Sequence, residues 1–234
     1  SVRDSLLQMA RTSGSKYQPT FQYDSLKSFG HFLNRKNDHN KLIQSQSNSN
    51  SNSNSNSNRS NGSYYKYFID AANVAYHRQN FEDGKFSYRQ IERVVEKLEE
   101  KIENEWKESN SAHGGGGDPK PKILIILPSI YGRVRKESIV LNSVKHENTN
   151  RVDKILQEDL DILNKFREKK MLYIVPNSCD DDLFWMYATV SDNHNHNHHH
   201  HHHHHHRDRD NGQSYVVTND LMRDHKFAFR SISD

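Results

Sequence analysis

Short apolar runs alternate with segments of helical periodicity, and this alternation limits the possible folds more than any other feature of the sequence. The runs are brief and continuous, as in strands covered on both faces, and they occur at 67–69, 123–127, 171–176 and 215–217. Between them, apolar residues recur every three or four positions in the segments 86–106, 151–169 and 181–190. Such an order implies a parallel sheet with right-handed crossovers. The sequence therefore predicts an α/β fold of three layers (α/β/α), with a central parallel sheet of about four strands.

Less regular sequence precedes and interrupts this pattern. Leu6, Leu7 and Met9 indicate a short first helix, and Asp24 with Ser25 is placed to cap a second. The apolar face of that second helix comprises Leu26, Phe29, Phe32 and Leu33. The Gln/Ser/Asn repeat that follows has almost nothing to bury and is expected to be disordered. We thus expect a helical lead-in at 1–41, a low-complexity insertion at 42–63, and an α/β domain at 64–234 with low-complexity loops near 109–118 and 191–213.

The composition fits one domain diluted by these tracts. Only 32% of the 234 residues are hydrophobic, yet removing the tracts leaves roughly 150 to 170 residues, the size of one domain. The formal charge of +3 permits a polyanionic partner such as nucleic acid. The single cysteine, Cys179, excludes an internal disulfide framework and indicates a reducing compartment. No apolar run approaches the ~20 residues of a membrane span, so we predict an intracellular protein with no membrane partner.

Acidic residues follow three of the four predicted strands. Asp70 ends the first, Asp181 and Asp182 come shortly after the third, and Asp220 comes just after the fourth. Because the carboxyl ends of parallel strands meet at one edge of a sheet, these acids are expected to converge there. Each acid taken alone has an ordinary alternative, which is to cap a helix, and Asp180 or Ser178 is placed to cap the third core helix in this way. Asn73 is expected to fix the turn around Asp70.

Several carboxylates held together repel one another unless a cation neutralises them. A helix N-terminus contributes roughly 0.3 to 1 kcal/mol per charge, which is too little to hold four of them. Oxygen ligands without Cys or His suit Mg²⁺ or Mn²⁺, which also bind phosphate oxygens. The chemistry that these ions support at such sites is hydrolysis of phosphodiesters.

Three blocks of the sequence resemble, in order, the metallonuclease domain of protein-only ribonuclease P, the PRORP family of the NYN/PIN-like nucleases. The blocks are FIDAANVAYHRQNF, SCDDDLFWMYATV and VVTNDLMRDH. The helix ending in GHFLNRKND also matches the family's lead-in, so the resemblance covers most of the ordered chain from about Ser25. It implies a PIN/NYN-like fold. It also implies a Mg²⁺-dependent endoribonuclease that removes the 5′ leader of precursor tRNA and leaves a 5′ phosphate on the tRNA.

The resemblance also assigns roles to residues by position. It places metal ligands at Asp70, Asp181, Asp182 and Asp220, with Asp224 in or beside the outer sphere of the metal. Apart from the resemblance, basic side chains close to the first and third blocks and in the loop after the second predicted strand are candidates for contact with RNA. They are His77, Arg78, Arg133, Arg135 and Arg223. A mitochondrial or nuclear location would fit the family.

The chain departs from the family in several places. Ala71 replaces the glycine that usually follows the first aspartate, and the cysteines and histidines of the family's structural zinc site are not found here. No repeat of about 34 residues is present, so an RNA-binding repeat domain would have to lie outside this chain. Since the chain begins at Ser1, we expect a piece of a longer protein. The histidine tract at 194–206 is interpreted as an expanded loop.

Two other functions share parts of this pattern. A catalytically inactive RNA-binding module could have the same fold, although retention of every expected acid argues against it. A phosphatase of the haloacid-dehalogenase type also begins with a strand ending in Asp. That group needs a second Asp two residues later, where this chain has Ala72.

Overall fold

A four-stranded parallel sheet forms the centre of the molecule in the computed structural model. The structure describes residues 2–12, 19–46, 64–79, 85–111, 120–133, 144–145, 152–153, 155–191 and 213–221. The strands of the sheet are β1 (Tyr65–Asp70), β2 (Lys122–Pro128), β5 (Leu172–Val175) and β6 (Tyr215–Val217). They pair in the order β5-β2-β1-β6, and every pairing is parallel. The predicted parallel sheet is therefore confirmed.

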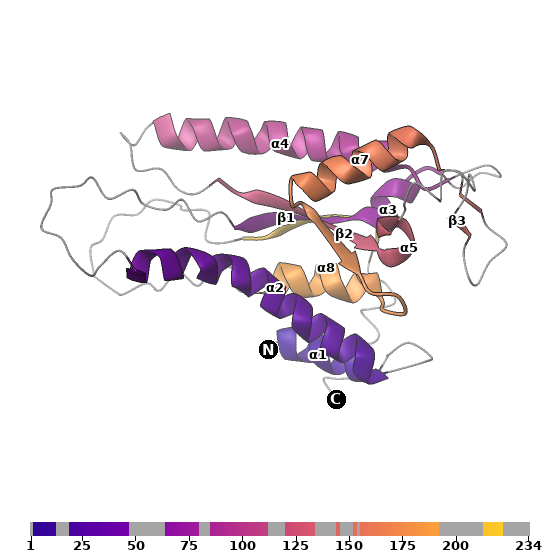
Figure 1. Cartoon of the computed structure of the whole chain (residues 1–234), viewed down its shortest axis with the longest axis horizontal. Helices are drawn as coiled ribbons and strands as arrows, with labels where there is room; N and C mark the ends of the chain where they lie inside the picture. The colour runs from indigo at the N-terminus through magenta and orange to yellow at the C-terminus, as the bar shows by residue number, and fades with distance from the viewer. Residues whose placement is uncertain are drawn as a thin grey trace, which may run out of the picture.

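Helices cover both faces of the sheet, which gives the three predicted layers (Figure 1). One face carries α1 (Val2–Thr12), α2 (Pro19–Gln46) and α8 (Asp181–Val190). The other face carries α4 (Tyr88–Ser111) and α7 (Gln157–Glu168). Two short helices, α3 (Ala71–Tyr76) and α5 (Ser129–Gly132), begin directly at the carboxyl ends of β1 and β2. No helix in the described ranges is long and apolar enough to cross a membrane.

Alternation of side chains along β1 divides the core into two clusters. Tyr67 and Ile69 pack on the side of α4 and α7, whereas Phe68 packs on the side of α1, α2 and α8. The strict alternation breaks at its start, because the register with β2 shifts between Tyr65 and Tyr67. Tyr65 therefore faces the same cluster as Phe68. Both Phe68 and Ile69 are fully buried, as expected for a central strand of a parallel sheet.

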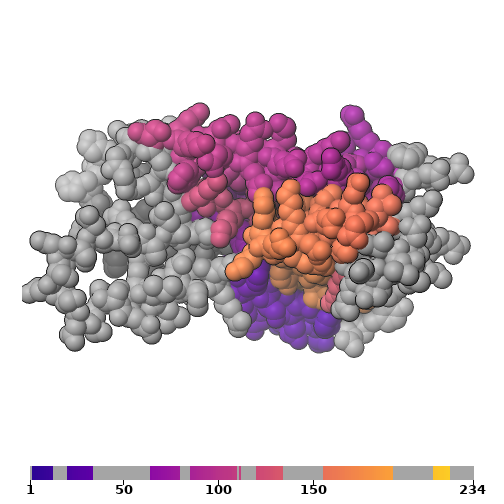
Figure 2. Space-filling view, turned by 45° about the horizontal axis from the view of Figure 1, so that its top comes forward, coloured from indigo at the N-terminus to yellow at the C-terminus, as the bar shows by residue number. Residues whose placement is uncertain are grey.

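The outer surfaces of α4 and α7 lie side by side (magenta and orange in Figure 2). Lys165 of α7 pairs with Glu92 of α4 at 2.9 Å, and Lys169 just beyond α7 pairs with Glu99 at 2.6 Å. Glu92 is largely buried, but both lysines are exposed, and surface pairs of this kind contribute only about 0 to 1 kcal/mol each. Burial of apolar side chains beneath them, such as Phe166 at 1% exposure, accounts for most of the packing energy.

Two predicted helix boundaries are wrong. Helix α2 begins at Pro19, so Asp24 and Ser25 lie inside it and do not cap it, and it continues to Gln46, past the expected end of the lead-in at 41. The helix predicted at 151–169 begins only at Gln157. Its expected first turn is instead extended, because β4 (Val152–Asp153) pairs antiparallel with β3 (Val144–Lys145).

Pairing with another segment thus overrides the helical period at the start of α7. Leu156, which was expected on the buried face, has φ −108° and ψ 161° and is 47% exposed. The other predicted helices and strands of the described ranges are confirmed, including Ser87 as the N-cap of α4, which accepts from the Gln90 N–H at 3.3 Å. Most of the low-complexity sequence, at 47–63, 112–119 and 192–212, lies outside the described residues.

Close packing of α2 against α8 gives a stability prediction. A Cβ at Gly30 would lie 2.7 Å from the hydroxyl oxygen of Tyr187, whose ring is 1% exposed. Gly30→Ala should therefore lower the free energy of unfolding by about 1 to 2 kcal/mol, measured by thermal or urea denaturation. An unobstructed helical site would instead gain about 0.5 to 1 kcal/mol from the same change. In the double variant with Tyr187→Phe, which lacks the obstructing oxygen, part of the loss should be recovered; a stabilised Gly30→Ala would contradict the close approach.

Candidate metal centre

Asp70 is the last residue of β1, and its carboxylate is held by the turn that follows. The residue is 1% exposed and caps α3. The Asn73 backbone N–H donates to Oδ1 at 3.2 Å, and the Asn73 side-chain amide donates to Oδ2 at 2.6 Å. The predicted role of Asn73 in fixing this turn is confirmed.

A second element reaches the same carboxylate from the neighbouring strand. The Thr218 hydroxyl, one residue past β6, donates to Asp70 Oδ2 at 2.6 Å. Its oxygen accepts from the Asp220 backbone N–H at 3.0 Å. Because β6 pairs with β1, this contact depends on strand order and was missed in the sequence. The available signal was a hydroxyl residue placed directly after the last strand.

The first turn of α8 supplies two more carboxylates. Asp180 is the N-cap, and its side chain accepts from the Asp182 backbone N–H at 3.1 Å. Asp182 in turn accepts a hydrogen bond on Oδ1 from the Trp185 indole N–H at 3.0 Å. Trp185 is buried, as predicted for a core residue, but this polar contact was not anticipated. A tryptophan three residues after an aspartate in a helix is the pattern that could have revealed it.

These acids converge, as their positions after parallel strands predict. Asp70, Asp181 and Asp182 each offer a carboxylate oxygen, and the three oxygens lie within 4.8 Å of one another. Burial, followed by the charges of Asp182 and Asp70, raises the pKa of Asp181 to about 7. Burial also raises the pKa of Asp70, against the hydrogen bonds from Thr218 and Asn73 that lower it. Both shifts show that negative charge is unfavourable here without a compensating cation.

The donor set fits a hard divalent cation. All three donors are carboxylate oxygens, which is the ligand type that Mg²⁺ and Mn²⁺ prefer. The oxygens are close enough to share one ion. The cluster could therefore bind a metal ion.

The other predicted site residues have different outcomes. Asp220 is half-buried but is not among the acids that lie within 4.8 Å of one another, and it contacts the site through its backbone N–H and Thr218. His77 and Arg78 are exposed after α3, and Arg133 is exposed after α5. Asp224, Arg135 and Arg223 lie outside the described residues.

Two curated proteins of Arabidopsis thaliana match this chain. "Proteinaceous RNase P 3" is 25% identical over 169 residues, which is 72% of this chain, and "Proteinaceous RNase P 2" is 26% identical over 163 residues, which is 70%. The sequence resembles proteinaceous RNase P. The resemblance inferred from the motifs is thus confirmed. The chain spans about a fifth of the length of these relatives, 20% and 21%.

Solved structures of proteinaceous RNase P 2 from A. thaliana also match. Two of them are 22% identical to this chain, with TM-scores of 0.36 and 0.40, and cover 72% and 90% of it. The chain covers 24% and 31% of those structures. No protein-family model matches the chain.

Repulsion within the cluster predicts the behaviour of Asp181→Asn. At about pH 8, above the pKa of about 7 of Asp181, removing its charge should raise the melting temperature in a chelator by about 2 to 6 °C and abolish the further rise that Mg²⁺ gives the wild type. Differential scanning fluorimetry measures both. Asp24→Asn removes an exposed acid on α2 and should change neither result. A wild-type melting temperature that does not respond to Mg²⁺ or Mn²⁺ would contradict a metal centre here.

Thr218 gives a second prediction for the same cluster. Thr218→Val keeps the shape of the side chain but removes the donor to Asp70, so Mn²⁺ affinity should fall by about 3- to 10-fold in a calorimetric titration. Thr218→Ser retains the hydroxyl and should bind Mn²⁺ within about 2-fold of the wild type. Wild-type affinity in Thr218→Val together with a loss in Thr218→Ser would show that the methyl packing, not the hydrogen bond, matters.

Proposed function

We propose that this chain carries the nuclease centre of a metal-dependent endoribonuclease that removes the 5′ leader of precursor tRNA. The observation that carries the proposal is the convergence of Asp70, Asp181 and Asp182 at the carboxyl edge of a parallel sheet. Similarity to two proteins named proteinaceous RNase P supports precursor tRNA as the substrate. A bound Mg²⁺ or Mn²⁺ would lower the pKa of an attacking water and stabilise the leaving oxygen of the phosphodiester.

The chain's own residues would hold this ion in a fixed place. Asp70 is oriented by Asn73 and Thr218, so its two oxygens have little freedom to turn. Asp182 is oriented by the Trp185 indole. Asp181 completes the set from the first turn of α8. We also propose Asp220 and Asp224 as additional acids of the centre, Asp224 beside the ligands, as the family pattern implies.

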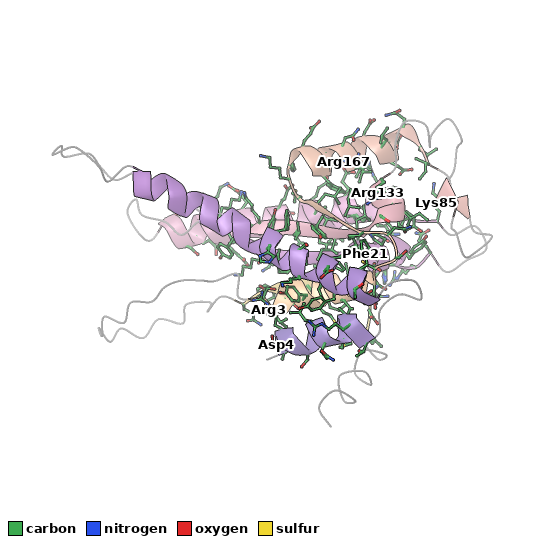
Figure 3. The ribbon with its side chains drawn as sticks, turned by 60° about the horizontal axis from the view of Figure 1, so that its bottom comes forward. Arg3, Asp4, Phe21, Lys85, Arg133 and Arg167 are labelled. Carbon is green, nitrogen blue, oxygen red and sulfur yellow. The ribbon has the colours of Figure 1, made fainter. Side chains whose placement is uncertain are left out.

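Basic side chains at the same edge would contact the phosphates of the RNA. Arg133 follows α5 at the carboxyl end of β2, and the Arg167 guanidinium holds this corner by donating to the Gly132 carbonyl at 2.6 Å. Arg133 and Arg167 lie on the opposite side of the molecule from Arg3 and Asp4 of α1 (Figure 3). His77, Arg78, Arg135 and Arg223 are proposed as further contacts.

Contacts with the body of the tRNA would come from other parts of the full-length protein. Because the chain spans about a fifth of its curated relatives, we propose that RNA-binding repeats and any structural zinc belong to other parts of the full-length protein. A reducing compartment, mitochondrial or nuclear, fits the single cysteine.

The decisive experiment uses the full-length protein and a precursor tRNA labelled at each end. The wild type should cut at the leader junction in Mg²⁺, leave a 5′ phosphate on the tRNA, and be inactive in a chelator. Asp181→Asn should lower kcat by about 10³-fold or more, because one ligand of the ion is lost. Asp24→Asn should cleave like the wild type.

Two results would oppose this function. Unchanged turnover in Asp181→Asn would remove the acidic cluster from the reaction. Binding of the precursor without metal-dependent cleavage by the wild type would instead favour a catalytically inactive RNA-binding module on the same fold.

A further inference from the structure

One buried side chain of α2 contacts the start of the helix that carries two of the acids. Gln22 is 1% exposed, and its Oε1 accepts from the Asp180 backbone N–H at 2.9 Å. The two residues are 158 positions apart in the sequence. The lead-in helix α2 is thereby joined to the N-terminus of α8.

The point of contact lies at the start of the helical turn that carries two of the acids. Asp180 is the N-cap of α8, and its side chain holds the Asp182 backbone N–H. A shift of the Asp180 peptide would therefore move the first turn, which includes both Asp181 and Asp182. The Ser25 side chain also lies beside Cys179 at the same junction, where it lowers the pKa of the thiol against the larger rise from burial.

Contacts between α2 and α8 continue along both helices, which lie side by side beneath the sheet (Figure 1). The rings of Phe29 and Phe184 are 5.4 Å apart, and Gly30 lies against the Tyr187 ring. Gln22 contacts Asp180, and Gly30, further along α2, contacts Tyr187, further along α8. The two contacts are about 12 Å apart along α2 and about 10.5 Å apart along α8, so the helices run in the same direction. Helix α2 therefore sets the position of α8 along its axis as well as its start.

Stability alone does not explain an amide at this position. The Gln22 Nε2 is buried and has no hydrogen-bond partner among the described residues. A buried donor without a partner is unfavourable, and an apolar side chain of the same length would avoid it. What the amide provides that an apolar residue would not is the acceptor for Asp180.

We propose that Gln22 is a positioning residue of the metal centre, which places the Asp181 and Asp182 carboxylates by fixing the Asp180 peptide. The inference rests on the proposed function, because it assigns Gln22 a purpose only where these acids bind a metal ion. It makes the lead-in helix part of the site, although α2 contributes no acid to the cluster.

The test is Gln22→Met in this 234-residue chain, titrated calorimetrically with Mn²⁺ alone. Methionine has nearly the same length and shape but offers only a weak acceptor, so Mn²⁺ should bind about 3- to 10-fold more weakly. The melting temperature in a chelator should stay within about 2 °C of the wild type, because the unpaired amide N–H₂ is removed together with the hydrogen bond.

Leu26→Val is the matched control. Leu26 is also fully buried on α2, and its shortening should lower the melting temperature by several degrees while leaving Mn²⁺ affinity unchanged. Wild-type affinity in Gln22→Met would overturn the proposal, as would an equal loss of affinity in Leu26→Val. A wild-type chain that binds no Mn²⁺ would overturn the proposed metal centre itself, a result distinct from either of these.

Discussion

Repulsion among Asp70, Asp181 and Asp182 is the constraint on which the rest of the structure depends. Two unit charges at 4.8 Å, the upper limit of the separations here, repel by roughly 3 to 4 kcal/mol at an effective dielectric constant of about 20. The N-terminus of α8 offsets only about 0.3 to 1 kcal/mol per charge. Packing must therefore hold the three acids together against a repulsion that a bound cation, or protonation of Asp181 below its pKa of about 7, relieves. The burial of β1 and the capped start of α8 provide that packing.

Neutral hydrogen-bond donors are suited to such a site. Asn73, Thr218 and Trp185 each donate to a carboxylate oxygen of the cluster and carry no charge. A neutral donor fixes the orientation of a carboxylate while leaving its charge available to a metal ion, whereas a lysine in the same place would compete with the ion. The donors come from the turn after β1, the exit of β6 and α8 itself. Three separate elements therefore each supply a hydrogen-bond donor to one cluster.

The sequence predicts contacts of this site only where they are local or follow from strand direction. Asn73 was identified because it lies three residues from Asp70. Convergence of Asp70 with Asp181 and Asp182 followed from parallel strands without knowledge of their order. The Thr218 contact, over 148 positions, requires β6 to lie beside β1, and strand order is not encoded in periodicity. The predicted start of α7 was wrong for a related reason. Val152–Asp153 pairs with Val144–Lys145, and this pairing outweighs the helical pattern of the sequence.

The lead-in differs from the α/β domain in its sequence pattern, but its helices α1 and α2 share a hydrophobic cluster with the sheet. Phe68 and Leu124 are fully buried on the face of the sheet that α1, α2 and α8 cover. A single helix such as α8 (Asp181–Val190) is about 10 to 12 Å wide, whereas four strands about 4.8 Å apart span roughly 14 Å, so α8 does not cover the sheet by itself. Without α1 and α2 much of this face would be exposed to water, at about 25 cal/mol for each Å² of apolar surface. The lead-in helices therefore pack on the sheet together with α8. Because Gln22 of α2 contacts Asp180 directly, a change in α2 acts on the acids of α8 through a single hydrogen bond.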